Sequence, residues 1–256
     1  MSGLQLQHMT MRFGGLTAVG DLDATIEPMG LIGLIGPNGA GKTTVFNVIT
    51  GVYQPTEGDV RFADKSLRGM RPSEITHAGI SRTFQNIRLF KGMTVFDNIR
   101  VSYAPKALHR TFGSLLRLGG FYAEEKRVAK KIDDLLDFFK LSHARNELAT
   151  SLPYGDQRRV EIIRALATEP KLLLLDEPAA GMNPTEKQNL MKLIRQLRDE
   201  FKISILLIEH DMSLVMGVCE RILVLDYGVK IAEGSPREIS SDPRVIEAYL
   251  GEVTHA

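Results

Sequence analysis

Short apolar runs alternate with segments of helical character along much of the chain. A run of four to six apolar residues bounded by polar residues or glycine is typical of a strand buried on both faces. Four such runs occur: 31–36 (LIGLIG), 171–176 (KLLLLD), 203–209 (ISILLIE) and 221–226 (RILVLD). Because helical segments separate the last three runs, the pattern predicts an α/β fold built on a mainly parallel sheet.

The first 27 residues show weak alternation instead, which predicts two short strands joined by a turn at Gly14-Gly15. This part is expected to form an N-terminal antiparallel β region. A helix is predicted from Lys42 to about Ile49, ended by Gly51. Two further helices should start at Asn183-Pro184-Thr185-Glu186 and Ser235-Pro236-Arg237-Glu238, where a capping residue precedes proline and Glu stands three positions on. Asp242-Pro243 resembles these starts.

The middle of the chain differs from both flanks. Residues 86–150 lack buried-strand runs and contain helical patterns such as 124–141. The basic segment 106–120 is predicted to be a loop with a short helix. We therefore expect a single domain over 1–256, with a core lobe at about 1–85 and 161–256 and an inserted α-helical subdomain at about 86–160.

Composition narrows the function classes. The chain has 256 residues with a net charge of +1, which gives no bulk electrostatic case for binding nucleic acid or an anionic membrane. Its single cysteine, Cys219, excludes an internal disulfide. No segment approaches about 18 continuous apolar residues, and the N-terminus has no signal-peptide core. Any membrane role is therefore expected to operate through a partner protein.

A phosphate-binding loop is predicted between the first buried strand and the helix after it. The segment GPNGAGKTT fits the pattern G-x-x-x-x-G-K-[ST] in the required strand–helix context. Glycines let backbone N–H groups approach phosphates, while Lys42 can reach the β- and γ-phosphates and Thr43 can offer its hydroxyl to Mg²⁺. A glycine-rich turn without a ligand would explain neither side chain. The predicted nucleotide-binding residues are Gly36, Pro37, Asn38, Gly39, Ala40, Gly41, Lys42, Thr43 and Thr44.

Two carboxylates follow the leucine run at 172–175. At the carboxyl end of a buried strand they would lie where open α/β sheets bind ligands. Asp176 is predicted to hold Mg²⁺ through water, and Glu177 to orient or deprotonate the attacking water. The alternative is a salt-bridged pair at a strand end, which is common for an isolated Asp-Glu.

Taken together, the motifs resemble those of the ATP-binding subunit of an ATP-binding-cassette (ABC) transporter over nearly the whole chain. They occur in the family's order: an aromatic residue near the start, then GPNGAGKTT, RTFQN, SLPYGDQRR, LLLLDEPAAGMN and LLIEHD. Within the family, RFGGLTAV, TVFDNI, LIEHDM and the ending VIEAYLGE look like the branched-chain amino-acid importer group, and like the longer of its two ATPases.

The resemblance implies roles for three further residues. Phe13 takes the place of the aromatic that stacks on adenine, with a core aromatic as the alternative. Gln85 matches the glutamine that senses Mg²⁺ and the γ-phosphate, and His210 matches the histidine that contacts the γ-phosphate. Glu209 or Asp211 could orient the His210 ring. The segment 179–183 matches the loop that contacts the other subunit, although Asn183 is equally explained as a helix cap.

In the family, the segment that reads SLPYGDQ here faces ATP held by the opposite subunit. The resemblance therefore places Pro153, Tyr154, Gly155 and Asp156 against a partner's nucleotide. Pro153 replaces a serine that could donate to the γ-phosphate, and Asp156 adds a negative charge. We expect a usable but weaker half-site. The second ATPase subunit could be a different chain or a second copy of this one, and the weaker half-site favours the heterodimer over the homodimer.

The expected protein is an ATP-hydrolysing motor that requires Mg²⁺ and binds integral membrane permease subunits, with the partner groove near 86–99. Its expected location is the cytoplasmic face of the inner membrane, without nucleic acid as a partner. An ATPase for lipopolysaccharide export or urea and amide import is the nearest alternative. Three more distant alternatives fit the sequence less well. A DNA-associated ABC ATPase would carry coiled coils or zinc modules, and a translation-associated ABC protein would carry two cassettes. A small-molecule kinase would need neither SLPYGDQ nor His210.

Overall fold

The computed structural model describes residues 3–103 and 120–250. The chain forms two compact units: Met1–Gln85 together with Lys171–Ala256, and the continuous segment Asn86–Pro170. The loop and short helix predicted at 106–120 lie, except for Gly120, outside the described residues. No helix in the described part of the chain is long and apolar enough to span a bilayer.

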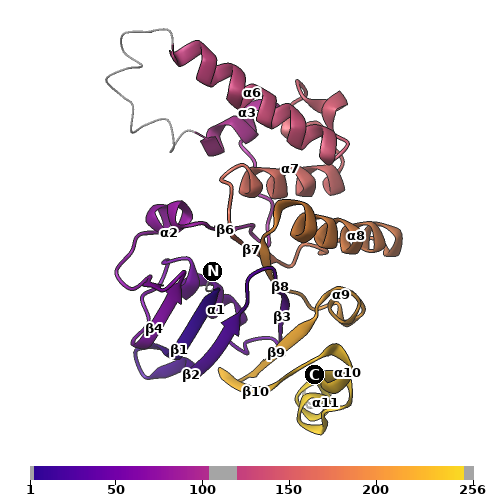
Figure 1. Ribbon diagram of the computed structural model, residues 1–256. Helices are drawn as coiled ribbons and strands as arrows, with labels where there is room; N and C mark the ends of the chain where they lie inside the picture. Colours follow the sequence, from indigo (N-terminus) through magenta and orange to yellow (C-terminus); the bar gives the residue numbers. More distant parts are fainter. Residues whose placement is uncertain (1–2, 104–119, 251–256) are drawn as a thin grey trace. The chain divides into compact units, whose positions relative to one another are not determined.

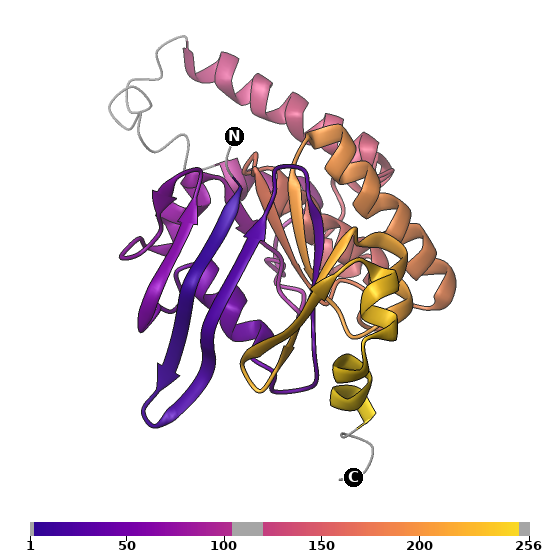
Figure 2. The same cartoon turned by 60° about the horizontal axis from the view of Figure 1, so that its bottom comes forward.

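The first unit contains an antiparallel sheet of four strands, in the order β2-β1-β4-β5. Its strands are β1 (Leu4–Phe13), β2 (Leu16–Ile26), β4 (Glu57–Phe62) and β5 (Lys65–Ser66). Figure 2 shows β1 and β2 as long neighbouring strands joined by a tight turn. The predicted antiparallel N-terminal region is thus confirmed, although β1 and β2 have 10 and 11 residues and are not short.

The second sheet of this unit has six strands, in the order β10-β9-β3-β8-β7-β6 (Figure 1). Only β10 runs antiparallel to its neighbour, so the predicted mainly parallel sheet is confirmed. Every residue of β3, β7 and β8 is buried, which explains their continuous apolar runs. The strands are β3 (Leu31–Ile35), β6 (Ile80–Arg82), β7 (Leu172–Asp176), β8 (Ser204–Ile208), β9 (Arg221–Asp226) and β10 (Val229–Gly234).

The helices of the first unit begin largely where their capping residues predict. Asn183 and Ser235 each accept a hydrogen bond from the backbone N–H three residues later, and both form capping boxes. Gly51 follows the phosphate-loop helix as expected. The helices are α1 (Lys42–Ile49), α2 (Pro72–Ala78), α8 (Pro184–Phe201), α9 (Met212–Val218), α10 (Pro236–Ser241) and α11 (Pro243–Leu250).

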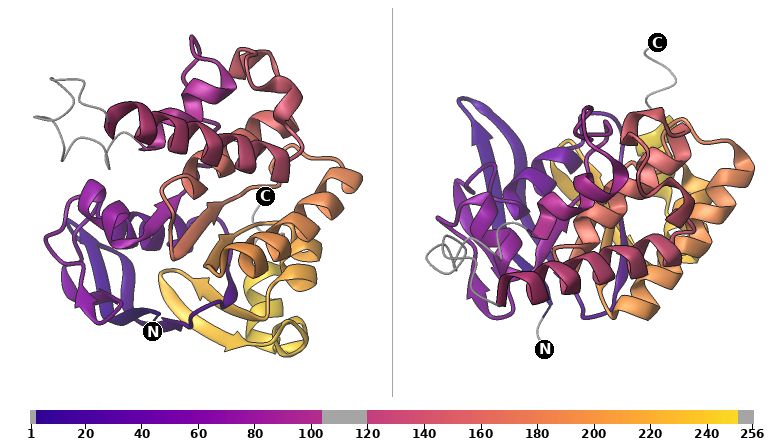
Figure 3. Two further views of the ribbon diagram at one scale, coloured as in Figure 1. Left: turned by 45° about the horizontal axis from the view of Figure 1, so that its top comes forward. Right: turned by 90° about the horizontal axis from the view of Figure 1, so that it is seen from above.

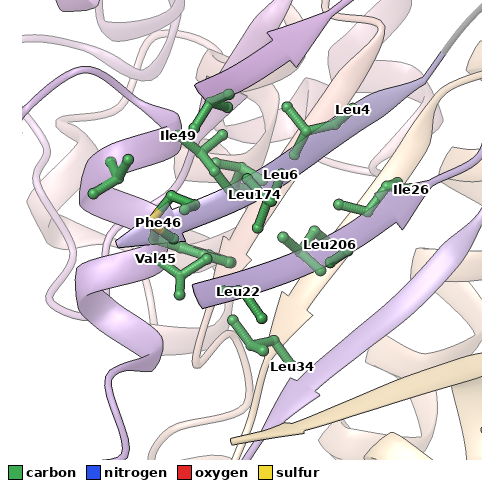
Figure 4. Packing of buried hydrophobic residues seen from close by; sticks show 14 of the residues in the cluster. Leu4, Leu6, Leu22, Ile26, Leu34, Val45, Phe46, Ile49, Leu174 and Leu206 are labelled. Carbon is green, nitrogen blue, oxygen red and sulfur yellow. The ribbon is translucent and has the colours of Figure 1, made fainter. Parts of the chain in front are cut away.

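The hydrophobic core of the first unit joins α1 to side chains from both sheets. Val45, Phe46 and Ile49 of α1 pack in one cluster with residues of β1, β2, β3, β7 and β8 (Figure 4). This packing fixes the phosphate-loop helix between a strand that carries Asp176 and the antiparallel sheet that carries Phe13.

In the second unit the described elements are helical, as predicted for this part of the chain; Figure 3 shows α6 as its longest helix. Residues 93–96 are held against 145–149 by backbone hydrogen bonds, including Val95 N–H to Glu147 O at 2.9 Å and Ala149 N–H to Met93 O at 3.1 Å. The elements are α3 (Val95–Arg100), η1 (Val101–Tyr103), α6 (Gly120–Phe138), η3 (Ser142–Ala144), η4 (Ala149–Ser151) and α7 (Tyr154–Leu166).

Candidate active site

The loop between β3 and α1 requires glycine at three positions. Gly36 has φ 147°, and a Cβ there would lie 2.0 Å from the carbonyl oxygen of Leu225. Gly41 has φ 98°, and its Cβ would lie 2.6 Å from the carbonyl oxygen of Ala18. Gly39, at φ 78°, would place a Cβ in space that holds no described atom within 4 Å. The loop therefore has a backbone that only glycine allows at these positions, which is typical of phosphate-binding loops.

Lys42 directly follows this loop. Its side chain is buried, and Nζ donates to the carbonyl oxygens of Gly36 at 2.6 Å and Pro37 at 2.7 Å. Thr43, the next residue of α1, is exposed. The first turn of α1 adds the positive potential of a helix N-terminus to the lysine charge. This donor set fits a nucleotide phosphate.

Asp176 ends β7 and is only 4% exposed. Its Oδ2 accepts a hydrogen bond of 2.7 Å from Nη2 of Arg82, while Oδ1 has no donor among the described residues. A salt bridge thus exists at this strand end, but Arg82 supplies it from β6. The hydroxyl, amide and carboxylate oxygens of Thr43, Gln85 and Asp176 are of the kind that Mg²⁺ prefers, so these residues fit that ion.

Glu177 contacts both of the other polar residues that are expected near the γ-phosphate, Gln85 and His210. Its Oε2 accepts from Nε2 of Gln85 at 2.7 Å, and its Oε1 lies 2.7 Å from Nε2 of His210. Its backbone N–H donates to Ile208 O, and its φ of 46° is in the left-handed region that a non-glycine residue rarely adopts.

Neither neighbour of His210 orients its ring. The carboxylate of Glu209 accepts from the backbone N–H groups of Ala179 at 2.7 Å and His210 at 3.1 Å, and burial raises the pKa of this carboxyl group. Asp211 caps α9 and accepts from Lys187, a hydrogen bond that lowers its pKa to about 2. The ring of His210 instead meets the carboxylate of Glu177.

Phe13 ends β1 and is 41% exposed, which does not fit a core aromatic. Its ring packs edge-to-face against the ring of Tyr53, with the two ring centroids 5.1 Å apart. An exposed aromatic at this edge of the antiparallel sheet is available to stack on a base.

In the second unit, α7 begins directly after Pro153, which occupies the N-cap position with φ −53°. The carbonyl oxygen of Pro153 accepts from the N–H groups of Asp156 and Gln157, so the missing proline N–H removes no helical hydrogen bond. Tyr154 is exposed and Asp156 pairs with Arg159 at 3.2 Å. The charge that Asp156 brings is thus partly matched within its own helix.

The segment 86–99, predicted to contain a partner groove, has both exposed and buried apolar residues. Phe90 and Met93 are exposed, whereas Leu89 and Phe96 are partly buried. Asn98 is fully buried and holds the segment in shape through hydrogen bonds to the backbone of Phe90, Met93 and Thr94.

Reasoning from the sequence missed Arg82 and Asn47. Arg82 stands inside RTFQN, the motif used for Gln85, and its side chain reaches both Asp176 and Asn47. The only signal in the sequence was a cation three residues before Gln85 in a strand end.

Comparison with known proteins agrees with this geometry. A family model described as "ABC transporter" matches residues 19–180, and one described as "Branched-chain amino acid ATP-binding cassette transporter" matches residues 229–255. The chain is 45% identical to the high-affinity branched-chain amino acid transport ATP-binding protein LivG of Escherichia coli (strain K12), over 97% of this chain and 98% of that protein. It is 43% identical to BraF of Pseudomonas aeruginosa, a protein of the same description, with the same coverage.

Two solved structures are also similar. The ADP conformation of an ATP-binding cassette of an ABC transporter superposes with a TM-score of 0.85 at 33% identity, covering 98% of this chain and 99% of that one. A dimeric post-hydrolysis state of another ATP-binding cassette, bound to ADP and Pi, gives a TM-score of 0.75 at 25% identity, covering 91% and 99%.

Proposed function

The chain belongs to the ATP-binding subunits of ABC transporters, in the branched-chain amino-acid group, and from this premise we propose that it powers the import of branched-chain amino acids. ATP hydrolysis by this subunit would drive permease subunits that carry the cargo. The observation that carries the proposal is the meeting of Gln85 and His210 on the carboxylate of Glu177, in the unit that holds the phosphate loop.

Lys42 and the backbone of the phosphate loop would bind the phosphates of ATP. Their preformed arrangement stabilises the charge that develops during phosphoryl transfer. Thr43, Gln85 and Asp176 would hold Mg²⁺, which when bound neutralises charge on the phosphates. Phe13 would stack on adenine from the antiparallel sheet.

Glu177 would position the attacking water and accept its proton. Gln85 and His210 each hold one oxygen of this carboxylate, which fixes its orientation before nucleotide arrives. Since a carboxylate accepts at both contacts, His210 donates from Nε2. Both contacts would rearrange when the γ-phosphate competes for the same donors.

A second ATPase subunit would complete the catalytic site. The start of α7, with Pro153, Tyr154, Gly155 and Asp156, would face the nucleotide of that subunit, and the segment 179–183 would contact it. Because Pro153 offers no hydroxyl or N–H, this half-site gives fewer contacts to a γ-phosphate than serine would. We therefore propose a heterodimer with two unequal sites.

Permease subunits would bind the segment 86–99, where Phe90 and Met93 are exposed. This association would hold the chain at the cytoplasmic face of the membrane. Large exposed apolar residues next to a well-ordered backbone are suited to such a contact.

The test is the Glu177→Gln variant. Loss of the general base should lower ATP hydrolysis by roughly 100-fold or more while nucleotide binding persists. Glu200→Gln, which changes an exposed glutamate of α8, is the matched control and should retain wild-type hydrolysis. Wild-type hydrolysis by the Glu177→Gln variant would refute the role of Glu177.

Solution size tests the assembly. With Mg-ATP, Glu177→Gln should remain monomeric alone and form a dimer when the second ATPase subunit is added. An ATP-dependent homodimer at micromolar concentration would refute the unequal heterodimer, because the Pro153 half-site would then hold ATP well enough by itself.

A further inference from the structure

We propose that Arg82 is a positioning residue that sets the separation between two of the elements that form the magnesium site, the end of β7 and the helix α1. The inference rests on the proposed metal-binding role of Asp176 and Thr43, and extends it to a residue outside the site.

Arg82 reaches both elements at once. Its Nη2 donates to Oδ2 of Asp176 at 2.7 Å, and its Nη1 donates to Oδ1 of Asn47 at 2.7 Å. The ion pair is almost completely buried, with side-chain exposures of 8% for Arg82 and 6% for Asp176. Its guanidinium carbon also lies 5.4 Å from the ring centroid of Phe46 and 5.3 Å from that of Phe84.

The two contacts bear directly on the residues that would hold the metal. Asn47 stands four residues after Thr43 in α1, so both project from the same face of the helix. The contact to Asp176 occupies Oδ2 and leaves Oδ1 without a described donor. Arg82 thus decides which carboxylate oxygen is available and how far the Thr43 face of α1 lies from it.

The backbone around Arg82 is itself fixed. Arg82 pairs with Leu174 in the parallel register of β6 and β7, and the N–H of Thr83 donates to the carbonyl oxygen of Leu174 at 2.9 Å. A planar guanidinium presents several donors in fixed directions, whereas a lysine offers a single charged point. Only an arginine can therefore connect Asn47 and Asp176 from this position.

A purely structural ion pair would support folding without affecting the metal. A positioning residue instead changes metal affinity, because loss of a partner that orients a ligand typically weakens metal binding by about 10-fold or more. Removal of a nearby positive charge alone would act in the opposite direction and strengthen binding of a cation. Weaker metal binding in the variant therefore indicates a positioning residue, stronger binding indicates a charge effect alone, and unchanged binding indicates a purely structural ion pair.

The experiment measures the dissociation constant of a non-hydrolysable ATP analogue in EDTA and in saturating Mg²⁺. The constant in EDTA divided by the constant in Mg²⁺ reports how strongly the metal contributes to binding. Arg82→Gln should reduce this ratio by about 10-fold or more, with the dissociation constant in EDTA unchanged. Arg82→Lys, which keeps the charge but cannot reach both partners, should reduce it by less. Arg61→Gln breaks an Arg–Asp pair in the antiparallel sheet and should leave the ratio unchanged.

An unchanged or increased ratio in Arg82→Gln would overturn the proposal. If Arg82→Gln does not fold, Asn47→Ala provides a second test, because it removes only the contact to α1. A wild-type ratio in both Asn47→Ala and Arg82→Lys would also overturn the proposal. Asp176→Asn distinguishes failure of the proposed metal site from failure of the inference about Arg82. If Asp176→Asn also keeps the wild-type ratio, Asp176 does not bind the metal, and the positioning role of Arg82 is refuted with it.

Discussion

Removal of the Asn98 side chain tests what shapes the segment proposed to face the permease. This amide is 0% exposed and is surrounded by the backbone of the turn before α3. Its Oδ1 accepts from Phe90 N–H at 2.9 Å, and its Nδ2 donates to the carbonyl oxygens of Phe90, Met93 and Thr94 at 3.0–3.2 Å. Asn98→Ala removes all of these contacts.

The expected loss follows from the number of hydrogen bonds. Two amide hydrogens shared among three carbonyls count as two bonds, and the bond from Phe90 N–H makes a third. At about 1 kcal/mol each, the local structure loses about 3 kcal/mol. Since about 1.4 kcal/mol corresponds to a factor of ten, hydrogen exchange at the Phe90 amide should accelerate by roughly 100-fold.

Hydrogen exchange followed by NMR on the purified chain provides the measurement. Asn98→Asp should lose at least as much protection, because its carboxylate has no N–H and faces three carbonyl oxygens. Asn146→Ala, an exposed amide that accepts from Arg145 in the same unit, should change nothing at Phe90. Exchange at Phe90 within about 3-fold of wild type in Asn98→Ala would refute the reasoning, since that corresponds to less than about 1 kcal/mol.

Three further outcomes are expected. Asn183→Ala should lower the stability of α8 by about 1 kcal/mol in thermal denaturation, because the capping box with Glu186 is lost, whereas Asn183→Asp should not; equal melting temperatures for both would contradict this. The hydrogen bond to Asp21 raises the pKa of His8 above 6.5, so its stabilising effect is complete below pH 6.5 and is lost as the pH rises through the higher folded-state pKa. Asp21→Asn should lower the NMR titration midpoint of His8, and an unchanged midpoint would contradict that cause. In the complex with permease and second ATPase, Pro153→Ser should leave ATP hydrolysis unchanged or raise it; a large loss would show that the proline is required.

The buried strands and capped helices could be predicted because each depends on local pattern. An unbroken apolar run, as in β7, is dictated by burial on both faces, and the capping boxes at Asn183 and Ser235 lie within four consecutive residues. The short β6 and the edge strand β10 were not predicted, because three residues carry no period and β10 lacks an apolar run.

In the candidate site, too, the residue types could be predicted from local motifs, whereas the contacts between side chains could not. The motifs identify Lys42, Glu177 and His210 as residue types suited to phosphate and water, but not which side chains meet. The contact between Arg82 and Asp176 joins residues 94 positions apart through side-chain directions set by the sheet register. Likewise, Glu209 and Asp211 flank His210 in sequence, yet their carboxylates accept hydrogen bonds from other groups, the backbone N–H of Ala179 and the side chain of Lys187.

The strand order has a consequence for synthesis on the ribosome. Strand β3 lies between β8 and β9, which begin at Ser204 and Arg221, so neither neighbour exists until most of the chain has been translated. At about 5 to 20 residues per second, its apolar residues wait on the order of ten seconds or more for both partners. The segment Asn86–Pro170 is continuous and can fold within that interval. Proteolysis of chains stalled after Pro170 should therefore cleave at β3 before it cleaves within the described helices of this segment; the opposite pattern would contradict this order of folding.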